Sequence, residues 1–88
     1  MEKIAALRQK IDEIDEKILL LLKERIEVSK KIGEIKQKQG IPVRDPKREE
    51  EKYKHISEKA AEFGLDAEDV KNLFQKIIDI SIRIQKSE

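Results

Sequence analysis

Residues 4–35, IAALRQKIDEIDEKILLLLKERIEVSKKIGEI, decide the fold, because apolar side chains recur in this stretch at alternating steps of three and four. That spacing predicts one long helix with an apolar seam, the pattern of helix-on-helix packing. The seam consists of Ile4, Leu7, Ile11, Ile14, Ile18, Leu21, Arg25, Val28, Ile32 and Ile35. Arg25 is its one polar member. Because a buried guanidinium without a partner costs several kcal/mol, we expect an anion beside Arg25, supplied by the protein or by a ligand.

Polar side chains interrupt apolar stripes in the later segments as well. Glu49 heads a stripe formed by Tyr53, Ile56, Ala60 and Phe63, whereas Ser81 and Gln85 continue one formed by Val70, Phe74, Ile77 and Ile78. Lys36 follows Arg25 by roughly three helical turns and projects in nearly the same direction. One such interruption is usually structural. Interruptions in all three segments, with both signs of charge, indicate a shared polar pocket inside an apolar core.

Composition limits the function classes. The 88 residues predict a single domain over 1–88. Charged residues make up 44% of the chain in mixed order with a net charge of +1, which argues against a nucleic-acid or membrane partner. Without a spanning apolar run or a signal-peptide pattern, we expect a cytoplasmic protein. The chain has no cysteine, and its single histidine, His55, is expected at the surface, so we expect no metal site.

Two glycine-centred breaks divide the chain into helices. Gly40 ends the first periodic segment, and Asp45 followed by proline restarts a helix as N-cap and first helical residue. Gly64 ends that second segment, and Asp66 caps the third. The sequence therefore predicts an all-α fold with one long helix near residues 3–38 and two short helices near residues 46–62 and 67–86.

The first helix is too long for its own chain to cover. It would measure roughly 50 Å, and each of the others about half of that. Residues 18–22, ILLLL, are apolar on every side, so something else must bury them. A second copy is the simplest candidate. If two long helices cross antiparallel near residues 16–17, Arg8 of one chain meets Arg25 of the other; the alternative, that Arg8 is a surface charge, stays open.

Short motifs along the whole chain resemble the small all-helical chorismate mutases of the AroQ class. The matching pieces are residues 7–11 (LRQKI), 15–19 (DEKIL), 24–25 (ER), Lys36, 42–45 (PVRD), 48–49 (RE), 73–78 (LFQKII), Ser81 and Gln85. The resemblance implies an intertwined helical homodimer that converts chorismate to prephenate, with two sites that each take one arginine from the other chain. It implies a substrate-binding set of Arg8 (from the partner chain), Arg25, Lys36, Asp45, Glu49, Ser81 and Gln85, with Arg48 in support.

The reaction attributed to this family is a unimolecular pericyclic rearrangement, which needs no nucleophile, proton transfer or cofactor. The protein must hold a flexible dianion in a reactive conformer and stabilise charge on the breaking ether bond. We expect Arg25 and the other chain's Arg8 to bind the two carboxylates, with Ser81 donating to one of them. The remaining assignments are Lys36 and Gln85 to opposite sides of the ether oxygen, Glu49 to the ring hydroxyl, and Asp45 to the helix cap. The catalytic residues among them would be Arg25, Lys36 and Gln85.

Three alternatives accompany this interpretation. The first is an isochorismate-pyruvate lyase of similar fold, whose pocket also binds a dianionic enol-pyruvyl ether. The second is a regulatory helical module cut from a fused shikimate-pathway enzyme. The third, a bare coiled-coil adaptor, is disfavoured because the predicted turns at residues 40–45 and 64–66 fold the chain back on itself.

Overall fold

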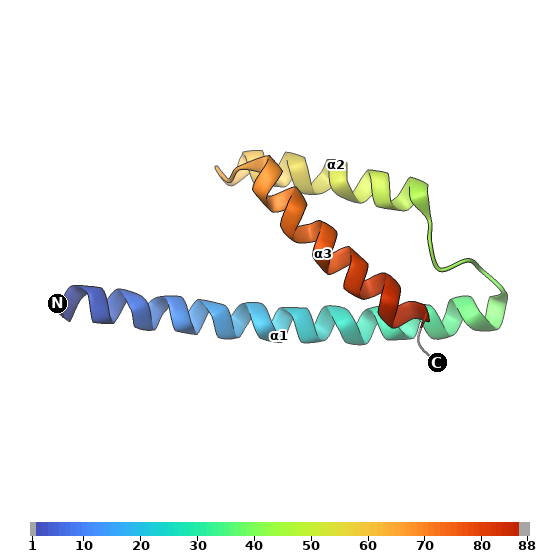
Figure 1. Cartoon of the computed structure of the whole chain (residues 1–88), viewed down its shortest axis with the longest axis horizontal. Helices are drawn as coiled ribbons and strands as arrows, with labels where there is room; N and C mark the ends of the chain where they lie inside the picture. Colours follow the sequence, from blue (N-terminus) through green and yellow to red (C-terminus); the bar gives the residue numbers. More distant parts are fainter. Residues whose placement is uncertain (1, 87–88) are drawn as a thin grey trace.

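The computed structural model describes residues 2–86 and contains three α-helices and no strand within them. The helices are α1 (Glu2–Gln39), α2 (Pro46–Glu62) and α3 (Ala67–Lys86). One long and two short helices were expected, and their ends lie within one residue of the predicted limits. The all-α class is confirmed (Figure 1).

Both turns have the local chemistry that the sequence predicted. Gly40 and Gly64 adopt positive φ angles of 66° and 72°, which residues with a side chain rarely tolerate. Each ends its helix with a backbone hydrogen bond spanning five residues, from Ile41 N to Lys36 O and from Leu65 N to Ala60 O, both 2.8 Å. These two turns reverse the chain.

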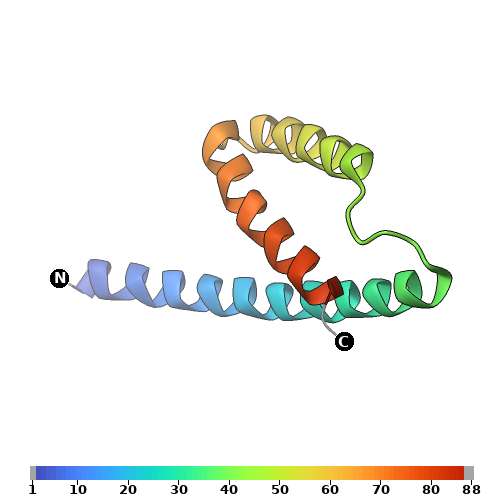
Figure 2. The ribbon, with the colours of Figure 1, turned by 45° about the vertical axis from the view of Figure 1, so that its right-hand side comes forward.

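Helix α3 connects the other two. In Figures 1 and 2 it runs diagonally from the far end of α2 back to the C-terminal half of α1. It packs against both helices, whereas α1 and α2 do not pack against each other within residues 2–86. The long axis of the chain, 57 Å, follows α1, so the N-terminal half of that helix projects beyond the rest.

The crossing of α1 and α3 uses small residues. Ser29 and Gly33 of α1 and Ser81 of α3 are buried there. A β-carbon added at Gly33 would lie only 2.7 Å from the Cα of Gln85. The two backbones therefore approach as closely as they do because position 33 carries no side chain.

The apolar seam of α1 lies beside this crossing and stays open. Val28 and Ile32 are 55% and 40% exposed although α3 packs next to them. Every residue from 2 to 21 is exposed, including Leu19, Leu20 and Leu21 at 63–64%. The expectation that the chain cannot cover its first helix is confirmed. None of the three helices, over residues 2–86, is apolar enough along sufficient length to cross a bilayer.

Candidate active site

The polar interruptions of all three segments meet at one cavity of about 440 Å³. Its walls come from α1, α2, α3 and the α1–α2 connection. They are formed by Arg25, Val28, Ser29, Ile32, Lys36, Val43, Asp45, Arg48, Glu49, Lys52, Ile78, Ser81, Ile82 and Gln85. Four of these side chains are cationic and two are carboxylates. The cavity therefore suits a small ligand with two negative charges.

Arg25 lies where α1 meets α3 and donates a hydrogen bond from Nη1 to Ser81 Oγ. Burial lowers the pKa of the Arg25 guanidinium from its ordinary value, because the charged form has lost part of its hydration. No carboxylate among residues 2–86 forms an ion pair with it. Of the two sources of an anion expected beside Arg25, residues 2–86 of this chain do not supply the first, and the cavity has room for the second, a ligand.

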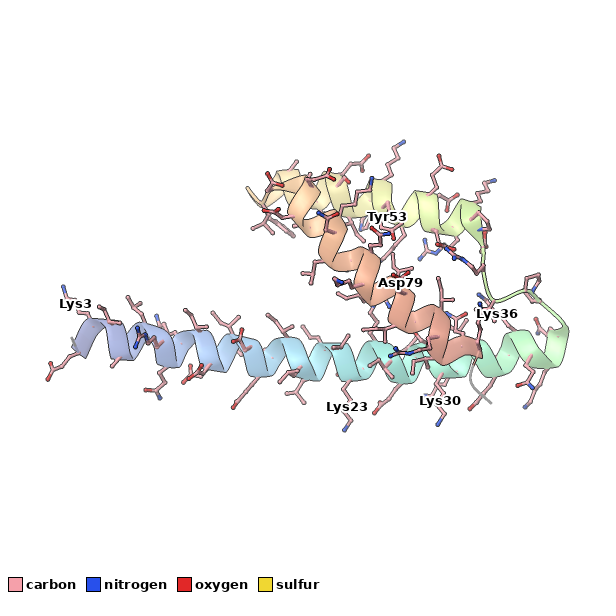
Figure 3. The ribbon with its side chains drawn as sticks, in the orientation of Figure 1. Lys3, Lys23, Lys30, Lys36, Tyr53 and Asp79 are labelled. Atoms are coloured by element: carbon pink, nitrogen blue, oxygen red, sulfur yellow. The ribbon has the colours of Figure 1, made fainter. Side chains whose placement is uncertain are left out.

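Lys36 and Gln85 lie together at the C-terminal ends of α1 and α3. Lys36 Nζ donates to the carbonyl oxygen of Val43, 2.7 Å away, and to Gln85 Oε1, 3.0 Å away. In Figure 3 Lys36 lies on the side of the α1–α2 connection, whereas Lys23 and Lys30 point away from α3. Because Oε1 accepts from Lys36, the amide N–H groups of Gln85 are left to donate elsewhere. A ligand atom with Lys36 and Gln85 on opposite sides would have to replace this direct contact.

Glu49 begins α2 with its carboxylate held by Arg44 of the preceding loop. Arg44 Nη2 lies 2.6 Å from Glu49 Oε1, and Nε lies 3.2 Å from Oε2. This hydrogen-bonded pair raises the pKa of the Arg44 guanidinium. The Glu49 side chain is 19% exposed, against 58% for Arg44, so the glutamate that lines the cavity is the enclosed partner and the arginine is the exposed one.

Asp45 is the N-cap of α2, as predicted. Its Oδ1 accepts a hydrogen bond of 3.1 Å from the backbone N–H of Arg48. The side chain is therefore committed to ending the loop and starting the helix. Through that cap Asp45 holds Arg48 and Glu49, its neighbours in the first turn, at the cavity.

The structure brings six of the seven predicted site residues to the cavity: Arg25, Lys36, Asp45, Glu49, Ser81 and Gln85. Arg48, expected in support, lines it as well. Arg8 does not; it is exposed in the projecting half of α1. That position agrees with the expectation that Arg8 cannot serve the same site as Arg25 within one chain.

Sequence reasoning missed Ser29, Gly33 and Arg44. Ser29 and Gly33 lie beside the seam, and a helical serine or glycine gives no sign of what packs on it. Arg44 belongs to the PVRD motif of residues 42–45, but its role was not predicted. Its position five residues before Glu49, at the start of a helix, could have indicated an ion pair. His55 is exposed, as expected, and within residues 2–86 no three histidine, cysteine or carboxylate side chains gather as a metal site requires.

Comparisons with known proteins show what this chain is similar to. A family model described as chorismate mutase type II matches residues 7–86. The chorismate mutase of Methanocaldococcus jannaschii is 42% identical over 86 residues, which cover 98% of this chain and 87% of that protein. The bifunctional chorismate mutase/prephenate dehydratase of Aquifex aeolicus is 38% identical over 98% of this chain, which spans only 25% of that longer protein.

A solved structure supports the fold as well. A conserved hypothetical protein from Pyrococcus furiosus superposes with a TM-score of 0.75 at 32% identity, covering 98% of this chain and 99% of the other. The family match extends over almost the whole chain, and the M. jannaschii relative is similar along nearly its full length. The resemblance found in the sequence is confirmed: the chain belongs to the type II, or AroQ-class, chorismate mutases.

Proposed function

We propose that this chain rearranges chorismate to prephenate as a homodimer, using only its own side chains. One observation carries the proposal. Arg25, Lys36, Ser81 and Gln85 converge on a cavity with an excess of positive charge, and the partly buried Arg25 has no carboxylate partner among residues 2–86. A dianionic substrate supplies the missing anion.

Positioning is the first task. Arg25 binds one substrate carboxylate through its planar guanidinium, with Ser81 beside it as a hydrogen-bond donor. Arg8 of the partner subunit binds the other. Fixing both carboxylates holds the substrate in the compact conformer from which the new carbon–carbon bond forms, so much of the entropic cost is met on binding.

Charge stabilisation is the second task. As the ether carbon–oxygen bond breaks, negative charge grows on the oxygen. Lys36 faces that oxygen with a point charge and Gln85 with an amide N–H, and both are fixed before the reaction begins. Glu49 accepts a hydrogen bond from the ring hydroxyl, while Asp45 acts through the helix cap.

The exposed apolar surface supports the homodimer. Ile4, Leu7, Ile11 and Ile14 are each more than 50% exposed, and the patch continues through residues 18–21. A monomer rarely leaves so long an apolar stripe in water. Arg8 and Arg25 are roughly 25 Å apart along one helix, too far for one small ligand to touch both. If two copies of α1 cross antiparallel near residues 16–17, Arg8 of one chain lies beside Arg25 of the other. The cytoplasmic location expected from the sequence stays a prediction.

The test is the disappearance of chorismate and the identity of the product. We expect prephenate and no release of pyruvate; pyruvate from isochorismate, without turnover of chorismate, would favour the lyase instead. Protein that is folded and dimeric but inactive toward both substrates would favour a regulatory module.

A matched pair of lysines tests the charge-stabilising role. Lys36 and Lys38 share the last turn of α1, but only Lys36 lines the cavity. We expect Lys36→Ala to lower kcat by about a hundredfold or more, as for other donors aimed at developing charge, and Lys38→Ala to leave it unchanged. Equal effects of the two changes would contradict the assignment of Lys36.

A further inference from the structure

A second serine lies in the cavity wall beside Ser81. Ser29 is buried, with 5% of its surface exposed, and its Oγ donates a hydrogen bond of 2.9 Å to Ser81 Oγ. It lies one helical turn after Arg25, which donates to the same Ser81 oxygen. One hydroxyl oxygen on α3 thus receives two hydrogen bonds from α1.

The valence of a hydroxyl group decides what Ser81 can then do. A serine Oγ has two lone pairs and one hydrogen. Arg25 is a donor only, so it must occupy one lone pair. Ser29 occupies the other. Ser81 has no acceptor capacity left, and its own hydrogen has no acceptor among the hydrogen bonds found within residues 2–86.

We propose that Ser29 is a positioning residue that, together with Arg25, fixes Ser81 as a hydrogen-bond donor to a ligand carboxylate in the cavity. This inference rests on the proposed function. Without Ser29, the Ser81 hydroxyl regains a free lone pair and can turn its hydrogen away from the ligand. The pocket then loses preorganisation although every group that touches the ligand is still present.

The kinetic consequence follows from where the carboxylate is held. In a Ser29 variant Arg25 still holds the carboxylate in the reactive conformer. The weakened Ser81 donor binds that carboxylate alike in the ground state and the transition state, so KM rises and kcat stays nearly unchanged. For Ser29→Ala we expect KM for chorismate to rise about three- to tenfold, the size of one net hydrogen bond. The inhibition constant of prephenate, which carries the same two carboxylates, should rise by a similar factor.

A double-mutant cycle separates positioning from simple packing. We compare the parent, Ser29→Ala, Ser81→Ala and the double variant at the same protein concentration. If Ser29 acts through Ser81, Ser29→Ala has no further effect on KM once Ser81 is alanine. A loss as large in the Ser81→Ala background as in the parent would overturn the proposal, because Ser29 would then support the fold in general.

Two further variants complete the design. Ser29→Thr keeps the hydroxyl and should restore KM to near the parent value, whereas Ser29→Cys, a close match in size with a weak donor, should fall between parent and alanine. Ser57→Ala removes a hydroxyl from α2 outside the cavity and serves as the control. If Ser29→Ala does not fold, the cysteine variant and its cycle with Ser81→Ala carry the test. A parent that does not convert chorismate refutes the proposed function, whereas an active parent with an unchanged Ser29→Ala KM refutes only this inference.

Discussion

The two halves of α1 share one apolar seam but have different surroundings. In the C-terminal half, Ser29 and Gly33 lie beside the seam, and α3 packs closely on them. In the N-terminal half every residue from 2 to 21 is exposed, including the seam from Ile4 to Leu21. A helix can therefore carry one continuous apolar seam while its own chain packs only beside that seam, and only in the C-terminal half of the helix.

The same comparison explains why one chain holds an incomplete site. The covered half contributes Arg25 and Lys36 to the cavity, whereas Arg8 lies on the open half. The proposed dimer joins the open half of each chain to the covered half of the other. The predictions below test that relation.

The largest effect is expected from removing either Arg8 or Arg25. Arg8→Ala and Arg25→Ala should each lose about a hundredfold or more in kcat/KM, because each removes a charged donor to a carboxylate. When the two variants are unfolded together and refolded, half of the dimers are mixed, and one site of each mixed dimer carries neither lesion. Turnover should recover to about a quarter of the parent value.

The controls are each variant refolded alone, together with mass spectrometry that shows the mixed dimers. Mixed dimers without recovered turnover would mean that the open half of α1 serves no site in the other chain.

A smaller effect is expected from adding a side chain at Gly33, where α1 and α3 cross. In Gly33→Ala the new β-carbon would lie 2.7 Å from Gln85 Cα and 2.8 Å from its carbonyl oxygen, so α3 must move. Displacing Gln85 by about 1 Å should lower kcat up to about a hundredfold. The melting temperature should fall as well, although Gly→Ala within a helix normally stabilises by about 1 kcal/mol.

Glu34→Ala is the matched control, because position 34 is exposed on the same turn. An active Gly33→Ala variant with a raised melting temperature would show that α3 does not cross α1 at this glycine.

Arg25→Leu makes the seam aliphatic throughout and so removes a difference between the two halves. Replacing a partly buried charge by a hydrophobic side chain is often neutral or stabilising, so we expect unchanged or higher stability in urea together with loss of turnover. Stability should be compared at one protein concentration, because a dimer's apparent stability depends on it. A destabilised variant that keeps its turnover per folded molecule would make Arg25 a structural residue.

The sequence predicted what depends on local chemistry. The turn glycines and the Asp45 cap act within a few residues, so the helix limits could be predicted. Arg25, Lys36, Ser81 and Gln85 stood out because each breaks or follows an apolar stripe. Their meeting at one cavity was inferred from periodicity and from the family resemblance together.

What the sequence could not give depends on contacts between distant segments. Gly33 and Ser29 acquire their roles only because residues 85 and 81 lie against them. The Arg44–Glu49 pair joins the α1–α2 connection to the first turn of α2, and loops follow no periodic pattern from which it could be predicted. Helix α3 packs on Ser29 and Gly33, beside the predicted seam and not on it, because small residues allow the two backbones to approach most closely.

The smallest effect is expected at Tyr53, a partly buried residue of α2 (Figure 3). Burial raises the pKa of its phenol above the ordinary value of about 10, and the carboxylates of Asp79 and Glu49 raise it further while Arg44 opposes them. Tyr53 is the only tyrosine of the chain, so the ultraviolet absorbance of tyrosinate reports on it alone. The titration midpoint of the folded protein should lie above that of the protein in denaturant.

The sign of the stability change follows from that shift. Because the folded-state pKa is the higher one, the neutral phenol stabilises the fold fully below the unfolded-state pKa, and this contribution is lost as the pH rises through the folded-state value. Tyr53→Phe should therefore lose less stability than the parent as the pH rises above about 10, measured by urea unfolding. Asp79→Asn should lower the midpoint, since it removes the larger of the two carboxylate effects. A midpoint at or below that of the unfolded chain would mean that the Tyr53 phenol is fully hydrated in the folded protein and that α2 and α3 do not enclose it.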